Sequence, residues 1–186
     1  GVFQIPIAND LGWFRTEFSL AIAIQNLAWG IATPLFGAFA EKLGDRKAVV
    51  VGVLVYALGL ALSSMASTAT SHQLLEILVG VGIAGTGFGV ILGVVGRAAS
   101  DETRSLALGL TTAAGSAGQI VGPPLTQYLL NATTWQTVFL MYAGVILLAL
   151  LALPFMKAPP KVSAQGLEQS LSKILNIAVR DPSYAL

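Results

Sequence analysis

Few side chains in this sequence could take part in covalent or acid–base chemistry. The chain of 186 residues has no cysteine and a single histidine, His72, so it offers neither a thiol nucleophile nor a histidine or cysteine metal cluster. Glu76 is the one carboxylate within a long uncharged run, where an ionisable group is a functional candidate. Because Glu76 stands near the start of that run, we expect a wetted carboxylate in the first turn of a helix. We expect no enzyme activity, cofactor or metal site, since these need several catalytic or ligating groups at one place.

A glycine-rich segment, Gly80-Val81-Gly82-Ile83-Ala84-Gly85, matches the spacing of phosphate-binding loops in dinucleotide-binding proteins. That function requires a preceding β-strand, whereas this segment lies inside an apolar run that continues through Gly87, Gly89 and Gly93. Small residues at such spacing allow membrane helices to approach closely. We therefore predict that these glycines pack helices and bind no nucleotide.

Polar side chains within the uncharged runs form a second group of candidates. Gln25 and Asn26 lie in the middle of one run, and Gln119 lies in a later one. An amide buried in a lipid environment needs a partner, which here is either a substrate or a neighbouring helix. Arg97 either attracts an anionic substrate or anchors its helix at the membrane surface. Together with Glu76, these residues define a candidate substrate pathway.

The elements that must position these side chains are long apolar helices. Hydrophobic residues make up 55% of the chain and charged residues 10%, and the mean hydropathy is +0.77. A membrane-spanning helix needs about 20 mainly apolar residues, and no segment alternates as the strands of a membrane barrel do. The sequence therefore predicts an all-α, polytopic membrane protein, with Gly1–Ile7 as the end of a first helix. Five complete spans follow, at Phe18–Phe36, Ala48–Ser67, Leu74–Gly96, Leu106–Leu130 and Trp135–Met156.

The basic residues predict the orientation of these spans. Apart from Arg15, Lys and Arg fall only in alternate gaps between the uncharged runs, and cytoplasmic loops retain such residues. We therefore expect residues 37–47, 97–104 and 157–181 to be cytoplasmic loops of a multi-pass protein in the plasma (inner) membrane. Its first partner is then the lipid bilayer. The basic residues are dispersed rather than gathered on one face, so we expect no nucleic-acid binding.

The sequence divides into two parts at Met156. Residues 1–156 hold the uncharged runs and form the predicted transmembrane domain. Residues 157–186 begin with a linker that contains Pro, Ser and Gln, after which apolar residues recur at helical spacing from Leu167 to Ala178. We expect a short amphipathic helix there, ended by Pro182, within a cytoplasmic linker.

The densest group of charges lies between the first two complete spans. Glu41 and Asp45 can pair with Arg46 or lie near a helix N-terminus, where the dipole stabilises an acid. Gly37 and Gly44 permit close packing or a positive φ. Such a cluster could hold one conformation of the protein and release it in another.

At this segment the sequence resembles the major facilitator superfamily. The family pattern is a glycine, three residues, an acid, a base, one residue, a glycine and then basic positions. It is filled here by Gly37, Glu41, Lys42, Gly44, Arg46 and Lys47. The departures are Glu41 and Lys42, where Asp and Arg are usual, and Asp45 in the first basic position. The resemblance implies a twelve-helix secondary transporter of two six-helix halves, in which this chain is the N-terminal half and a C-terminal half is missing.

Three further segments bear on the type of transporter. Glu76 stands where the family often has an arginine, so the arginine associated with proton-coupled drug efflux is absent. The segment Leu11–Glu17 is similar to an outer loop of the bacterial monocarboxylate and oxalate/formate transporters. The third segment is similar to the family's glycine–proline motif and is formed by Gly118, Gly122, Pro123 and Pro124. That motif is often associated with antiport. The same residues also fit a kinked helix whose glycines allow close packing.

These resemblances imply secondary active transport of a small organic solute by alternating access, with a monocarboxylate or another organic anion as the solute. The alternative is an efflux antiporter for drugs or metabolites, and a third possibility is a polytopic membrane protein that transports nothing. A coupling ion or a counter-substrate would be a further partner. We expect Glu41 and Arg46 to gate the movement, and Gln25, Asn26 and Gln119 to contact the solute.

Overall fold

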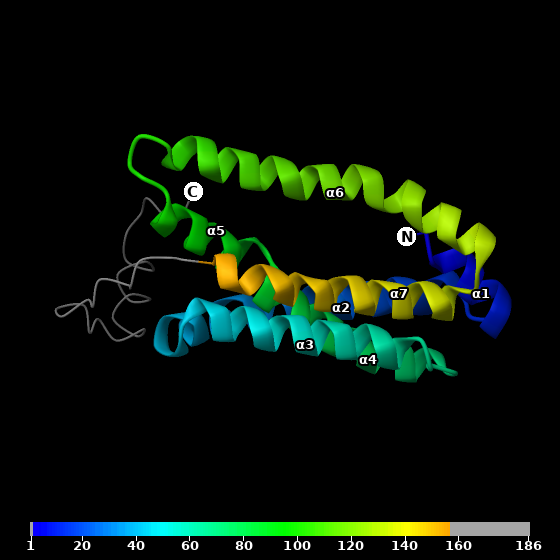
Figure 1. Cartoon of the computed structure of the whole chain (residues 1–186). Coiled ribbons are helices and arrows are strands. Elements are labelled where there is room, and N and C mark those ends of the chain that lie inside the picture. Colours follow the sequence, from blue (N-terminus) through cyan, green and yellow to red (C-terminus); the bar gives the residue numbers. More distant parts are fainter. Residues whose placement is uncertain (1, 157–186) are drawn as a thin grey trace, which may run out of the picture.

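The computed structural model describes residues 2–156, and within that range it consists of helices and their connections (Figure 1). The long helices lie roughly side by side, so segments that are distant in the sequence share each end of the bundle. The amphipathic helix expected after Gly166 lies outside the described residues. The elements are α1 (Gln4–Leu11), α2 (Arg15–Leu43), α3 (Asp45–Ser63), α4 (Ala69–Thr86), α5 (Phe88–Ala98), α6 (Arg104–Ala132), α7 (Trp135–Leu148) and the short 3-10 helix η1 (Ala149–Phe155).

The helices confirm the predicted all-α, polytopic fold. Within residues 2–156, four helical segments are long and apolar enough to cross a membrane, namely Arg15–Leu43, Asp45–Ser63, Ala69–Ala98 and Trp135–Phe155. α6, with 29 residues, is also long enough, but it does not reach the same apolarity. Its Thr, Ser, Gln and Gly residues lower its mean hydropathy. The fourth predicted span, Leu106–Leu130, is therefore one continuous helix that is more polar than the other four.

The run expected at Leu74–Gly96 forms two helices rather than one. α4 starts earlier, at Ala69, because the Thr68 hydroxyl accepts a hydrogen bond from the Ser71 amide at 3.2 Å and caps the helix. The extended backbone of Gly87 then separates α4 from α5. This span therefore has a break within it.

Glycines bring α4 into direct contact with α2 and α3. A Cβ atom added at Gly82 would lie 2.4 Å from Cα of Tyr56 in α3. One added at Gly80 would lie 2.3 Å from the carbonyl oxygen of Gln25 in α2. No side chain fits at such distances, so the prediction that the glycine-rich segment packs helices is confirmed. α2, α3 and α4 together form the most closely packed part of the bundle.

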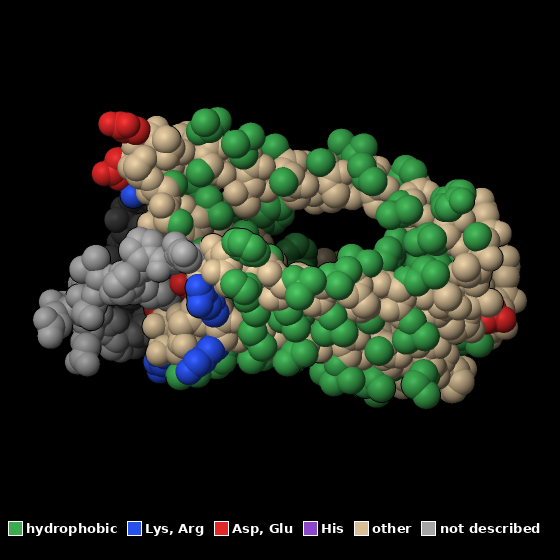
Figure 2. All heavy atoms as spheres, viewed as in Figure 1, with side chains coloured by type: hydrophobic (Ala, Val, Ile, Leu, Met, Phe, Trp, Pro, Cys, Tyr) green, Lys and Arg blue, Asp and Glu red, His purple; other side chains and the backbone are tan. Residues whose placement is uncertain are grey.

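α6 lies apart from the other helices along much of its length, and open space is visible beside it (Figures 1 and 2). It contacts mainly α5 and α7. The helix continues through Pro123 and Pro124. A Cβ atom added at Gly118 or Gly122 would meet nothing within 4 Å among the described residues. A packing role for this glycine–proline segment therefore stays a prediction.

The first described element is the short helix α1. It continues past the expected end at Ile7 and stops at Gly12, whose φ of +67° lies in the left-handed region that favours glycine. In its last turn, the Asp10 carboxylate accepts hydrogen bonds from Trp135 Nε1 at 2.7 Å and from Gln136 Nε2 at 3.1 Å. These bonds hold the start of α7 beside α1, at the end of the bundle that we call the α1 end (Figure 1).

Candidate functional site

The charged segment between the first two complete spans contains a one-residue joint. α2 continues through Gly37 to Leu43, and α3 begins at Asp45. Between them, Gly44 has a φ of +99°, which a residue with a side chain rarely adopts. The segment is therefore two helix ends that meet at a sharp turn rather than an extended loop.

An ion pair connects this joint to α5. The carboxylate of Asp45 lies 2.6 Å from Nη2 of Arg97, and the two side chains are 15% and 33% exposed, respectively. Asp45 also lies in the first turn of α3, where the helix dipole stabilises an acid. Arg46 donates a hydrogen bond through Nε to the backbone carbonyl oxygen of Met156 at 2.9 Å. The joint is thus connected to the ends of both α5 and η1.

These contacts bring separate basic segments to one end of the molecule, which we call the basic end. Figure 2 shows Lys and Arg side chains gathered there, while hydrophobic side chains cover the lengths of the helices. The segments 37–47 and 97–104 share this end, as expected from the charge pattern. Glu41, Lys42 and Lys47 are exposed there. The gating role expected for Glu41 and Arg46 stays a prediction.

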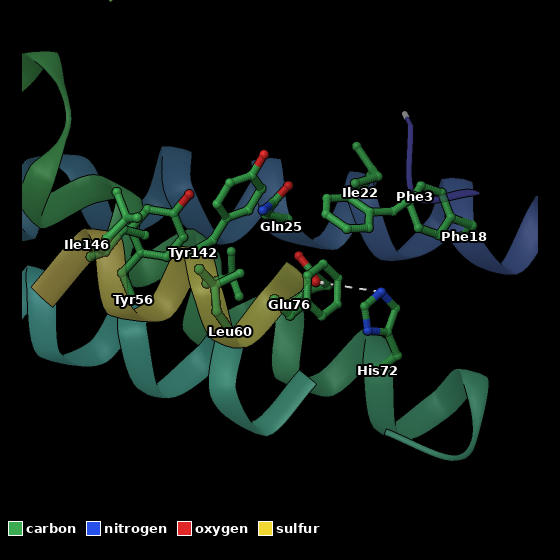
Figure 3. A pocket seen from close by; sticks show the side chains of 13 residues that line it. Phe3, Phe18, Ile22, Gln25, Tyr56, Leu60, His72, Glu76, Tyr142 and Ile146 are labelled. Carbon is green, nitrogen blue, oxygen red and sulfur yellow. Dashed lines mark ion pairs between the residues drawn. The ribbon is translucent and has the colours of Figure 1, made fainter. Parts of the chain in front are cut away.

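A cavity of about 390 Å³ extends from the α1 end toward the middle of the bundle (Figure 3). Its volume falls within the range of roughly 300–1,000 Å³ that is usual for small-molecule sites. Most of the wall is aromatic or aliphatic, and a few polar groups converge on it. The lining residues are Phe3, Phe18, Ile22, Gln25, Tyr56, Leu60, His72, Glu76, Val79, Phe139, Tyr142, Val145 and Ile146.

Glu76 is buried in the wall of this cavity, with only 5% of its surface exposed. The expectation of a wetted carboxylate in a first turn is therefore wrong. The cause is the early start of α4 at Ala69, which puts Glu76 about two turns inside the helix. Oε1 lies 3.6 Å from Nε2 of His72, while Oε2 has no hydrogen-bond partner among the described residues. A buried carboxylate oxygen without a partner is costly, so it is available to a ligand.

His72 is a member of the site that the sequence analysis did not identify. Its ring lies among aromatic rings, with centroids 5.5 Å from Trp13 and 6.2 Å from both Phe18 and Phe139. The ring is nearly parallel to that of Phe139, at 11°. The spacing of His72 and Glu76, four residues apart on one helix face, was the signal that could have found this pair.

The structure brings two of the five candidate pathway residues together. Gln25 lines the cavity with Glu76, and Figure 3 shows both side chains beside it. Asn26 is exposed and donates a hydrogen bond from Nδ2 to the Ile22 carbonyl oxygen at 2.8 Å. Gln119 is exposed on α6, and Arg97 is paired at the basic end. Neither of these last two lines the cavity.

Known proteins give independent information about the chain. Monocarboxylate transporter 11 from Mus musculus is 31% identical over 145 residues, which cover 75% of this chain and 30% of that protein. Monocarboxylate transporter 13 from Rattus norvegicus is 34% identical over 153 residues, covering 76% and 35%. Methyl viologen resistance protein SmvA from Salmonella typhimurium is 25% identical over 142 residues, covering 76% and 27%. The chain thus spans about a third of the length of these relatives.

A family model covers nearly the whole chain. Residues 1–185 match the model that describes the Major Facilitator Superfamily. This match agrees with the apolar spanning helices and with the charged joint at Gly44. The chain is therefore part of a multi-pass membrane protein, and it belongs to the major facilitator superfamily of membrane transporters.

Proposed function

We propose that this chain is the N-terminal half of a longer secondary transporter that moves a small organic solute by alternating access. The observation that carries the proposal is the cavity of about 390 Å³, in which the buried carboxylate of Glu76 has an oxygen without a hydrogen-bond partner in residues 2–156. Two-half transporters bind their solutes near the bilayer midplane, and the halves rock around that site. In this proposal residues 157–186 are the cytoplasmic linker to the second half.

Two classes of solute have support. The segment Leu11–Glu17 and the relatives named monocarboxylate transporters favour a small carboxylate. Relatives named for resistance to methyl viologen and, in Vibrio parahaemolyticus, to multiple drugs favour efflux of a drug or metabolite. Both classes fit a transporter of the plasma membrane that is driven by a coupling ion or by exchange with a counter-substrate.

Transport by the full-length protein tests the proposal. We expect proteoliposomes that contain it to show saturable uptake or exchange of at least one small carboxylate or organic cation, driven by a proton or solute gradient. Uptake equal to that of empty liposomes for every solute, from correctly inserted protein, would contradict the proposal.

Neutralising Glu41 tests the gating role of the charged segment. Glu41 is exposed in the last turn of α2, just before the Gly44 joint. Its carboxylate can therefore form an ion pair in another conformation of the transporter. We expect Glu41→Gln to lower the transport rate about fivefold or more, the size of a modest coupling between conformations, without a change in membrane insertion. Glu102→Gln is the matched control, because Glu102 is an exposed acid in the segment 97–104. Equal transport by the two variants and the unmodified protein would contradict a gating role for Glu41.

A further inference from the structure

The cavity beside Glu76 has an unbalanced charge. Thirteen of the described residues line it, and Glu76 is the one carboxylic acid among them. None of these residues is Lys or Arg. The other polar members in the wall are His72 from α4 itself, Gln25 from α2, Tyr56 from α3 and Tyr142 from α7. Within residues 2–156 the cavity therefore presents a carboxyl group with no Lys or Arg beside it to balance the charge of its ionised form.

Aromatic rings occupy much of the rest of the wall. They come from four parts of the fold: Phe3 just before α1, Phe18 in α2, Tyr56 in α3, and Phe139 and Tyr142 in α7. Phe3 connects two of the α7 rings, with centroids 4.6 Å from Phe139 and 6.3 Å from Tyr142. The face of such a ring carries partial negative charge and attracts a cation that lies within about 6 Å of its centre.

We infer that this cavity binds a small organic cation, such as a quaternary ammonium or a protonated amine with an aromatic or aliphatic body. The inference rests on the proposed transport function and names its class of solute. The cationic group would lie against the Glu76 carboxylate, whose oxygen Oε2 has no partner among the described residues, and against the ring faces. The apolar body of the ligand would contact side chains such as Leu60, Val79 and Ile146.

The same wall disfavours a carboxylate ligand. An anion in the cavity would face the buried carboxyl group of Glu76. The ionised form of this group would repel the anion strongly in a poorly solvated site, and its protonated form would offer no opposite charge. His72 is the lining side chain that could become cationic, and its Nε2 already faces the Glu76 carboxylate at 3.6 Å. Acidic residues also outnumber basic ones among the described residues at the α1 end. The acids there are Asp10, Glu17 and Glu76, and the one Lys or Arg is Arg15. This end of the bundle therefore attracts cations toward the cavity.

Two ligands of similar size and opposite charge test the inference on the full-length protein. We would measure equilibrium binding of benzyltrimethylammonium and of 3-phenylpropanoate by calorimetry in detergent micelles. We expect the cation to bind at least about tenfold more tightly than the anion. Tighter binding of the anion, or no binding of the cation, would overturn the inference, and neither result depends on whether a variant folds.

Glu76→Gln keeps the shape of the side chain and removes its charge. We expect it to weaken binding of benzyltrimethylammonium at least about tenfold, whereas Glu102→Gln, at the exposed surface, leaves binding unchanged. Phe139→Leu removes one ring face, and we expect it to weaken cation binding about threefold. Unchanged cation binding by folded Glu76→Gln would show that the cation binds elsewhere and would overturn the inference.

The binding result and the transport result separate the two proposals. Gradient-driven uptake of a carboxylate without cation binding would overturn this inference and leave the transporter proposal standing. Cation binding that depends on Glu76, without transport of any solute, would support the site and contradict the transporter proposal.

Discussion

Gly82→Leu is expected to prevent the full-length protein from forming its helical bundle. A Cβ atom at Gly82 would lie 2.4 Å from Cα, Cβ and N of Tyr56, and these include backbone atoms that no rotamer change can move away. α3 and α4 must therefore separate, and the cavity between them loses its wall. Overpacking a core usually lowers the free energy of unfolding by about 1–3 kcal/mol. We expect Gly82→Leu to lower it by an amount at the upper end of this range or beyond. Size-exclusion chromatography of detergent extracts and the melting temperature would measure the loss.

Gly144→Leu is the matched control for this experiment. Gly144 lies within the apolar helix α7, is exposed, and an added Cβ would meet nothing within 4 Å in the described part of the chain. We expect this variant to keep the yield and melting temperature of the unmodified protein. If Gly82→Leu and Gly144→Leu had the same yield and the same melting temperature, this result would contradict the close approach of α3 and α4.

Asp45→Ala is expected to lower both the stability and the transport rate of the full-length protein. The carboxylate is 2.6 Å from Arg97, and the pair is mostly buried at the basic end. Removing it should cost between the ~0.2–1 kcal/mol of an exposed pair and the ~3–5 kcal/mol of a buried one. Because the pair connects the α2–α3 joint to α5, its loss should also change the balance between conformations. Thermal unfolding and proteoliposome uptake would measure these two effects.

The exposed pair of Asp101 with Arg104 provides the control. Its N–O distance is similar, 2.8 Å, and Asp101 lies just before α6 as Asp45 lies at the start of α3, but the Asp101 side chain is 90% exposed. We expect Asp101→Ala to change the melting temperature little and the transport rate not at all. An Asp45→Ala variant with the stability and transport of Asp101→Ala would show that the Asp45–Arg97 pair has no such role.

The sequence predicted the helices well because long apolar runs leave the backbone few alternatives in a membrane. It predicted the ends of the helices less well. The Thr68 cap makes α4 begin earlier in the chain than the apolar run does. Gly87 divides that run into two helices, although the residues on both sides of it are apolar. The joint between α2 and α3 is a single residue, Gly44, where the charged sequence suggested a loop. Each difference arises from local backbone geometry that hydropathy does not record.

The site was only partly visible in the sequence. Glu76 was a candidate because a lone acid in an apolar run is unusual, but its burial depends on where α4 begins and on rings such as Phe18 and Phe139 near His72. Those rings belong to other helices, so their approach could not be derived from spacing along the chain. Asn26 and Gln119 were equally plausible from their positions, yet they do not line the cavity. Which side of a helix faces a cavity depends on packing.

Access to the cavity from each side of the membrane tests alternating access most directly. This chain has no cysteine, so Gln25→Cys, made in a cysteine-free background of the full-length protein, would place one reactive thiol in the cavity wall. We predict that a membrane-impermeant maleimide labels this thiol from one side without solute, and that labelling from the other side increases when a transported solute is present. Labelling from the same side only, at a rate that no solute changes, would contradict the account.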